Sequence, residues 1–149
     1  AAAGCQLVAQ CDLAVAVDTA KFVTSGVTWG FFCSTPGVAI GRNLHRKHAM
    51  EMLLTGEPIN AQRAMEWGLV NRVVPAAQLD AEVLQLARTI ASKPPATTAA
   101  GKRAFYLQMG MDLTRAYELA GEVISSSFAH AEGQAGMEAF IEKRPPPGN

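Results

Sequence analysis

The chain has 149 residues; 49% of them are hydrophobic and 17% charged, and thirteen basic side chains balance thirteen acidic ones. This composition is typical of one globular domain with a substantial core, and it excludes a disordered polymer. The balanced charge creates no large field that would attract nucleic acid or an anionic membrane, and no apolar run reaches the roughly 20 residues of a membrane-spanning helix. We therefore expect neither nucleic acid nor membrane as a partner.

The first twelve residues combine small side chains with a short apolar run, and they predict a helix that begins near Gly4. The N-terminus of a helix presents backbone N–H groups without intrahelical acceptors, together with a partial positive charge. Such a place can hold an anion, or the oxyanion that develops when a carbonyl is attacked. The alternative is that the small residues only let this helix pack closely on a strand.

The cysteines Cys5, Cys11 and Cys33 are odd in number and stand in apolar surroundings, which favours a reducing, intracellular compartment. Cys5 and Cys11 do not form a Cys-x-x-Cys pattern, so we interpret them as small buried residues.

Extended segments are predicted at residues 12–17, 20–24 and 69–74. A helix that ends near residue 43 is expected to use Thr35 as its N-cap and Pro36 as its first residue.

The next helix is predicted to end at Gly56 and to bury a stripe of apolar side chains, namely Met50, Met52, Leu53 and Leu54. His45 and His48 near its start could share one face as metal ligands, but no third ligand stands at a matching spacing. A solvated, positively charged helix start is the simpler interpretation, and we predict no metal site.

The rest of the chain is predicted to be mostly helical. Asn60 is the expected N-cap of a helix over 61–67. Further helices are predicted from apolar periodicity and from breaks at proline and glycine, at 79–90, 96–109, 113–130 and 132–143.

The order of several sequence words resembles the crotonase family, also called the enoyl-CoA hydratase/isomerase superfamily. These words are Ala-Ala-Gly-Cys-Gln-Leu at 2–7, Phe-Cys-Ser-Thr-Pro-Gly-Val at 32–38, Leu-Leu-Thr-Gly-Glu-Pro-Ile at 53–59 and Trp-Gly-Leu-Val at 67–70. The first two point to one particular branch of the family. The resemblance runs from Ala1 to about Arg144, and it is specific because the words occur in the right order at compatible spacings.

The resemblance implies an α/β fold of the ClpP/crotonase type, present here as its C-terminal part. Residues 1–90 would then belong to the crotonase core, 91–144 to helices for oligomerisation and coenzyme A contact, and 145–149 to a flexible tail. The chain begins without methionine on a segment that lies inside crotonases. We therefore expect further strands and half of the oxyanion hole to precede Ala1.

In the family, two backbone N–H groups stabilise the enolate-like oxygen of an acyl-CoA thioester. The resemblance places one of them at Ala3, where relatives usually carry glycine. Hydratases also use two glutamates as proton carriers, and the matching positions here hold Gln6 and Gly26. Since neither residue can transfer a proton near neutral pH, standard hydration chemistry lacks its usual groups.

Other residues have weaker claims to a functional role. Cys33 could be a nucleophile, but no histidine is placed to activate it, so a buried loop thiol is the simpler interpretation. Phe140 and Lys143 match a family word whose residues approach the adenine and phosphates of coenzyme A held by a neighbouring subunit. The alternative for them is an ordinary cationic helix end. Trp29 and Trp67 are interpreted as core or interface residues.

The resemblance implies a crotonase-family protein that acts on or binds acyl-CoA thioesters, with coenzyme A as part of the substrate and no covalently bound cofactor. The alternative is a non-catalytic acyl-CoA-binding or regulatory oligomer. A homotrimer or hexamer is expected, in the cytoplasm or, in a eukaryote, the mitochondrial matrix, with the cytoplasm preferred. Replacing both Gln6 and Gly26 by glutamate is expected to create hydration if the scaffold survives.

Overall fold

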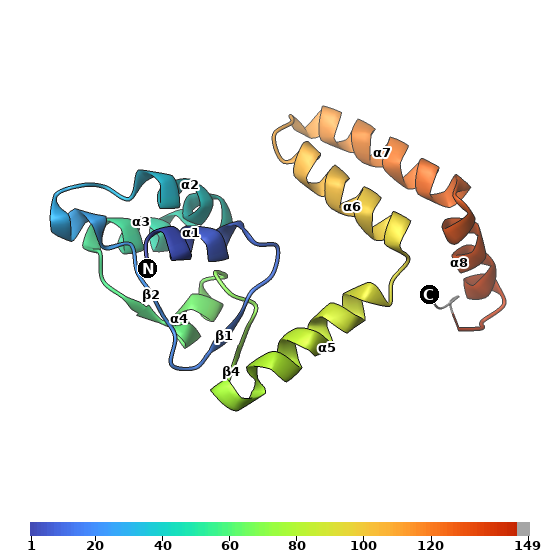
Figure 1. The fold of residues 1–149 in the computed structure, drawn as a ribbon. Coiled ribbons are helices and arrows are strands. Elements are labelled where there is room, and N and C mark those ends of the chain that lie inside the picture. The colour runs from blue at the N-terminus through green and yellow to red at the C-terminus, as the bar shows by residue number, and fades with distance from the viewer. Residues whose placement is uncertain (146–149) are drawn as a thin grey trace. The chain divides into compact units, whose positions relative to one another are not determined.

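The computed structural model describes residues 1–145 (Figure 1). The chain divides into two compact units, Ala1–Gln85 and Leu86–Asn149, and helix α5 (Leu79–Ala91) crosses the boundary between them. Of the tail predicted at 145–149, residues 146–149 lie outside the described residues. Among the described helices, none combines the length and apolar character that crossing a bilayer requires.

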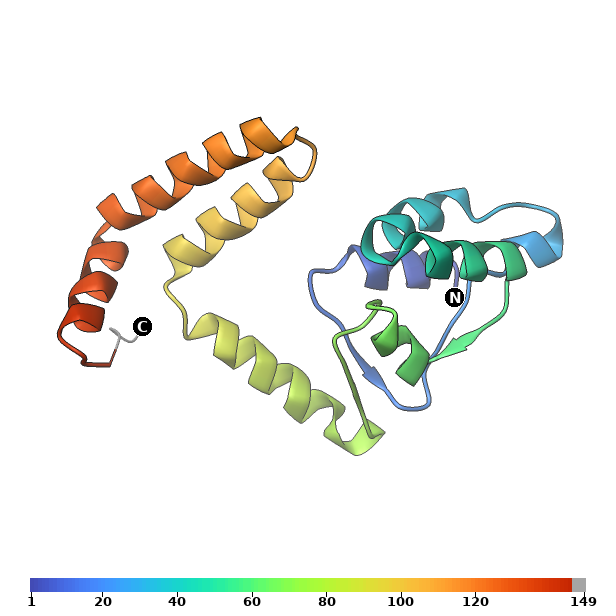
Figure 2. The ribbon, with the colours of Figure 1, turned by 180° about the vertical axis from the view of Figure 1, so that it is seen from behind.

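The first unit alternates short helices with very short strands. Its helices are α1 (Ala3–Gln10), α2 (Ser34–Asn43), α3 (Arg46–Thr55) and α4 (Ala61–Glu66), with 3₁₀ turns at Ser25–Trp29 and Ala76–Gln78. Its strands are β1 (Val15–Val17), β2 (Lys21–Phe22), β3 (Ile59–Asn60) and β4 (Arg72–Val74). Figures 1 and 2 show α1, α2 and α3 gathered on one side of this unit, with the strands and α4 on the other.

The strands form two separate pairs. β1 runs parallel to β4, with Ala16 opposite Val73. β2 runs antiparallel to β3, with Phe22 opposite Ile59. A parallel pair needs a long crossover connection, and here the helices α2 to α4 supply it. The unit is therefore of the α/β type.

Part of the core of the first unit lies where α1 packs against α2. On α1 the buried residues are Cys5 and Ala9, four positions apart and so on one helical face. Ala39 and Ile40 of α2 are also buried. Asn43 extends this contact, since its amide nitrogen donates to the carbonyls of Ala9 and Ala39, 2.8 Å away in each case. The small residues of α1 thus allow close packing, but against a helix rather than the predicted strand.

Sequence patterns located the first-unit helices well. The αL residue Gly56 ends α3 with a φ of 65°, and Asn60 caps α4 through a 2.8 Å bond from the Arg63 N–H. Both predictions are confirmed. α2 begins at Ser34, two residues earlier than expected, with Cys33 rather than Thr35 as its N-cap. The segments predicted as strands at 12–17 and 69–74 contain β1 and β4, which are only three residues each.

The burial of several side chains was predicted incorrectly. Cys11 is exposed, because it follows the last turn of α1 rather than facing its buried side. On α3 the buried residues are Ala49, Met52 and Leu53, whereas Met50 and Leu54 are 41% and 60% exposed. These two side chains lie on the opposite face of the same helix.

After the end of α5, the described part of the second unit contains the helices α6 (Pro95–Gln108), α7 (Leu113–Ala129) and α8 (Ala131–Ile141), which confirms the helices predicted there. α6 and α7 form an antiparallel hairpin (Figure 1). Of the described residues after Leu86, only Ala139 is buried. Large apolar side chains are exposed on these helices, among them Phe105, Leu113, Tyr117, Phe128 and Phe140.

Candidate functional site

The turn that precedes α1 has an uncommon backbone conformation. Ala2 has a φ of 44° and a ψ of −108°, a region that residues with a Cβ rarely adopt and that costs about 1–3 kcal/mol. The turn is held by a 2.8 Å bond from the Ala2 N–H to the Val23 carbonyl and by another from the Gly4 N–H to the Ala1 carbonyl. Ala3 is the first residue of α1 and is exposed. Its N–H is among the group of first-turn donors that a helix leaves without internal acceptors.

Gln6 lies one turn further along α1 than Ala3 and is partly buried. Between them, Cys5 is 1% exposed. Burial, and to a smaller extent the nearby Cys33, raise the pKa of the Cys5 thiol. The chain's amino terminus and a hydrogen bond with the backbone of Val23 lower it, but burial is the largest effect and the pKa is raised overall. The thiol of Cys5 therefore stays protonated at neutral pH and behaves as a small core group.

Gly26 is buried in the 3₁₀ turn Ser25–Trp29, and its surroundings leave no space for a side chain. A Cβ added there would lie 2.6 Å from the Phe31 carbonyl oxygen and 2.7 Å from the Cys33 sulfur. The first of these atoms belongs to the backbone, so a side chain at position 26 requires the loop 31–33 to move. The Gly26→Glu substitution, which was expected to help create hydration, therefore requires the backbone to move as well as the side chain to change.

Cys33 is the residue that occupies this space. Its sulfur accepts a 3.2 Å hydrogen bond from the Gly26 N–H, and its side chain is buried, with 6% exposure. The interpretation of Cys33 as a buried loop thiol is confirmed. Its role in filling position 26 was not predicted, because no sequence pattern relates a cysteine to a glycine seven residues earlier.

The two positions expected to hold proton carriers are thus a partly buried amide at Gln6 and a closed turn at Gly26. Glu51 on α3 and Glu57 in the turn after it are both exposed. Within the described residues, no group of three or more His, Cys, Asp or Glu side chains could hold a metal ion. The arrangement offers backbone N–H groups at the start of α1, with an amide rather than a carboxylate at Gln6.

The histidines near α3 have structural contacts. His45 is the N-cap of α3, and its Nδ1 accepts from the Lys47 N–H at 3.4 Å. His48 stacks on Trp67 with ring centroids 4.4 Å apart, and the Arg63 guanidinium lies 5.5 Å from the centre of the same indole. Trp67 packs against the core as predicted, whereas Trp29 is 74% exposed and does not belong to the core of this unit.

The end of α8 carries the expected coenzyme A contact residues. Phe140 is 81% exposed. Lys143, just beyond the helix, has a φ of 54°, which is uncommon for a residue other than glycine. The Lys143 N–H donates to the Phe140 carbonyl at 3.2 Å and the Arg144 N–H to the Ala139 carbonyl at 3.0 Å. These bonds resemble the common left-handed ending of a helix and fix the backbone at Lys143.

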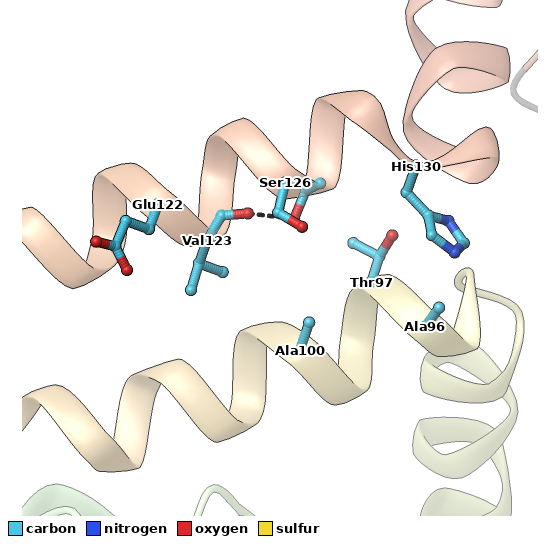
Figure 3. A pocket seen from close by; sticks show the side chains of 8 residues that line it. Ala96, Thr97, Ala100, Glu122, Val123, Ser126 and His130 are labelled. Carbon is cyan, nitrogen blue, oxygen red and sulfur yellow. Dashed lines mark hydrogen bonds between the residues drawn. The ribbon is translucent and has the colours of Figure 1, made fainter.

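A pocket of about 410 Å³ lies between α6 and α7 (Figure 3). Ala96 and Ala100 leave room for it on the α6 side, and the hydroxyl of Ser127 is satisfied by a 2.8 Å bond to the Val123 carbonyl. The remaining lining residues are Thr97, Glu122, Ser126 and His130. No sequence pattern predicted this pocket, since its two walls come from different helices.

Comparison with known proteins places these features in context. The family model for enoyl-CoA hydratase/isomerase matches residues 1–148. The mouse protein named "Enoyl-CoA hydratase domain-containing protein 3, mitochondrial" is 53% identical over 145 residues, which are 97% of this chain and 48% of the relative. The sequence words at 2–7 and 32–38 pointed to this branch, and that expectation is confirmed.

Two solved structures are similar over almost all of this chain. The crystal structure of an enoyl-CoA hydratase from Mycobacterium smegmatis has a TM-score of 0.94 and 49% identity, covering 98% of this chain and 57% of that one. The crystal structure of human enoyl Coenzyme A hydratase domain-containing protein 3 has a TM-score of 0.92 and 51% identity, covering 98% and 58%. They confirm the α/β fold of the crotonase type. The chain spans about half the length of the curated relatives it matches.

Proposed function

Because this chain belongs to the enoyl-CoA hydratase/isomerase family, we propose that it is part of a protein that binds acyl-CoA thioesters and holds the thioester oxygen at the start of α1. The substrate class is that of the family, with coenzyme A as part of the ligand and no covalently bound cofactor. The observation that carries the proposal is the constrained turn at Ala2, which begins a helix exposed at Ala3.

Ala3 is the proposed donor to the thioester oxygen. The donor group is the backbone N–H, so a methyl side chain in place of glycine does not remove it. Such donors act most strongly when they are fixed before the oxygen develops charge, and removing one typically costs about 2.7–4 kcal/mol in the barrier. The bonds from the Ala2 and Gly4 N–H groups supply this fixation on either side of Ala3.

Hydration by the usual pair of glutamates is the reaction that this site supports least. Gln6 stands at one of the two positions, and at the other Gly26 has no space for a side chain. General acid–base catalysis typically contributes 10²–10⁴-fold. The packing around Gly26 therefore favours the second candidate function, a non-catalytic acyl-CoA-binding or regulatory protein that keeps the fold.

Phe140 and Lys143 are the proposed contacts to the nucleotide half of coenzyme A, an exposed aromatic ring and a cation near one helix end. The exposed apolar side chains of α6, α7 and α8 support a homo-oligomer, and a trimer or hexamer is proposed.

The proposed location depends on the source of the chain. The mouse relative is named as a mitochondrial protein, which supports the mitochondrial matrix for a eukaryotic source. The cytoplasm preferred from the sequence alone stays a prediction for a bacterial one.

One set of assays tests binding and turnover together. Full-length protein is mixed with crotonyl-CoA, and loss of the 2-enoyl absorbance reports hydration; butyryl-CoA binding is measured by calorimetry. We expect butyryl-CoA to bind and crotonyl-CoA to show no turnover above background. Turnover at the rate of ordinary hydratases would contradict the proposed loss of the proton carriers, and absence of any binding would contradict the function itself.

The role of Ala3 has a more specific test. Ala3→Pro removes the N–H at the first helical position, where proline is tolerated, and Ala3→Gly keeps the N–H. Infrared spectra of butyryl-CoA with a ¹³C-labelled thioester carbonyl should show a lowered stretching frequency on wild type and Ala3→Gly. The lowering should diminish on Ala3→Pro that retains the wild-type circular dichroism spectrum.

A further inference from the structure

Helix α6 begins without a cap of its own. Its N-cap residue is Pro94, whose side chain cannot accept a hydrogen bond, and Pro95 follows in the first helical position. The first N–H groups of a helix need acceptors from elsewhere. The N-cap residue of α6 supplies no such acceptor from its side chain.

Glu132 of α8 supplies an acceptor. One of its carboxylate oxygens, Oε2, accepts from both the N–H and the hydroxyl of Thr97, at 3.2 Å in each case. Glu132 also stands in the first turn of α8. Its negative charge therefore lies near the N-termini of two helices, where a carboxylate is favourable. The contact joins residues 35 positions apart and holds the start of α8 against α6.

The corner between α7 and α8 restricts α8 in the same way. His130 ends α7 and is the N-cap of α8, accepting from the Glu132 N–H at 3.4 Å. Behind it, a Cβ on Gly133 would overlap the Ser127 carbonyl oxygen, so the two helices touch through backbone. Figure 3 shows His130 and Thr97 facing each other across the end of the hairpin.

The far end of α8 presents an aromatic ring and a cation. Phe140 is 81% exposed, whereas its neighbour Ala139 is buried. Lys143 is held in a left-handed conformation by the helix-ending bonds. A flat apolar ring and a nearby ammonium group match an adenine base and its phosphates. The direction in which Phe140 and Lys143 project depends on the direction of α8. The direction of α8 depends in turn on the contacts of its first turn.

We propose that Thr97 and Glu132 are positioning residues for coenzyme A recognition: their contact fixes α8 so that Phe140 and Lys143 meet the nucleotide half of the ligand. This inference rests on the proposed function. Neither residue touches the ligand. Their effect is confined to the part of coenzyme A that carries the adenine and phosphates, and leaves the acyl thioester end unaffected.

The test compares two ligands with the same acyl thioester, butyryl-CoA and S-butyryl-pantetheine, which lacks the nucleotide. Thr97→Val and Glu132→Ala should each weaken butyryl-CoA binding roughly three- to tenfold, while binding of S-butyryl-pantetheine changes by less than about twofold. Because the two substitutions break the same contact, their effects should not add. The double variant should have about the same affinity for butyryl-CoA as the single variant with the lower affinity.

Thr98→Val is the matched control, because the Thr98 hydroxyl bonds to the Pro94 carbonyl of its own helix turn rather than to α8. It should leave both affinities unchanged. If Thr97→Val lowers the melting temperature, Thr97→Ser, which keeps a hydroxyl, must restore the affinity for butyryl-CoA.

Four outcomes would overturn the inference. Equal weakening of both ligands would mean a general structural effect, and unchanged butyryl-CoA binding would mean that the contact positions nothing. If the wild-type protein binds the two ligands with equal affinity, the nucleotide makes no contact, although thioester binding stands. If it binds neither ligand, the proposed function fails together with this inference.

Discussion

The N–H of Gly26 donates a hydrogen bond to the sulfur of Cys33 over 3.2 Å. The same sulfur stands 2.7 Å from the point where a Cβ of residue 26 would be. The thiol thus fills the space of a side chain that glycine lacks and satisfies the backbone of that glycine. Placing a proton-carrying side chain at this position would therefore require the loop to repack, and would involve more than one residue.

Gly26→Ala is expected to lower the free energy of unfolding by about 1–3 kcal/mol, because the new methyl group must displace the Phe31 carbonyl or the Cys33 thiol. Urea denaturation followed by circular dichroism measures the change. The control is Gly4→Ala, a helical position with open space around it, which should be neutral or stabilising. A Gly26→Ala variant as stable as wild type would show that the loop yields easily.

The pair Gln6→Glu and Gly26→Glu is no longer expected to produce a hydratase. The side chain at 26 cannot enter without displacing backbone, so the double variant should be destabilised and inactive with crotonyl-CoA. Gln6→Glu alone is nearly isosteric and should fold like wild type, but one carboxylate lacks its partner. Hydration by the double variant at a rate well above that of Gln6→Glu would refute the packing argument.

Stability should depend on pH through Cys5. Its pKa is raised in the folded chain from the ordinary value of 9.0, so above that pH the unfolded chain loses the proton first. The folded state then binds more protons, and the free energy of unfolding falls as pH rises. The stabilising contribution of protonated Cys5 to the free energy of unfolding is fully present below pH 9.0. Denaturant titrations between about pH 8 and 10 should show a steeper fall for wild type than for Cys5→Ala; identical slopes would count against a raised pKa.

Gly133→Ala is expected to destabilise the corner between α7 and α8 by about 1–3 kcal/mol or more, since its methyl group meets the Ser127 carbonyl. Gly136→Ala on the same helix has open space and should be neutral or stabilising. Melting temperatures of the two variants provide the comparison. Equal melting temperatures would mean that α8 can shift away from α7.

Thr24→Val should cost about 1–3 kcal/mol, because the fully buried Thr24 hydroxyl donates a 2.8 Å bond to the Met52 carbonyl. Valine has a similar shape, so packing is nearly conserved and the loss reports the hydrogen bond. Thr55→Val is the exposed control: its hydroxyl donates to the Glu51 carbonyl and accepts from the Glu57 N–H, both at the exposed end of α3. Similar losses for both variants would contradict a special role of the buried bond.

The sequence determined the helices and the family. Helix ends were readable because residues such as Gly56 and Asn60 act on their own chain neighbours, and apolar periodicity repeats within a few turns. The ordered words were sufficient for the family, which the match over residues 1–148 confirms. The residue types at Gln6 and Gly26 were visible, although their surroundings were not.

Only the tertiary structure decided what surrounds those residues. Whether Cys11, Met50 or Leu54 is buried depends on which face a neighbouring element covers, and a single helix pattern does not contain that information. The closure of Gly26 by Cys33 depends on the path of a loop, and the contact of Thr97 with Glu132 on the folding back of α8. Such contacts arise from side chains that meet in space after the chain has turned, so local propensities cannot specify them.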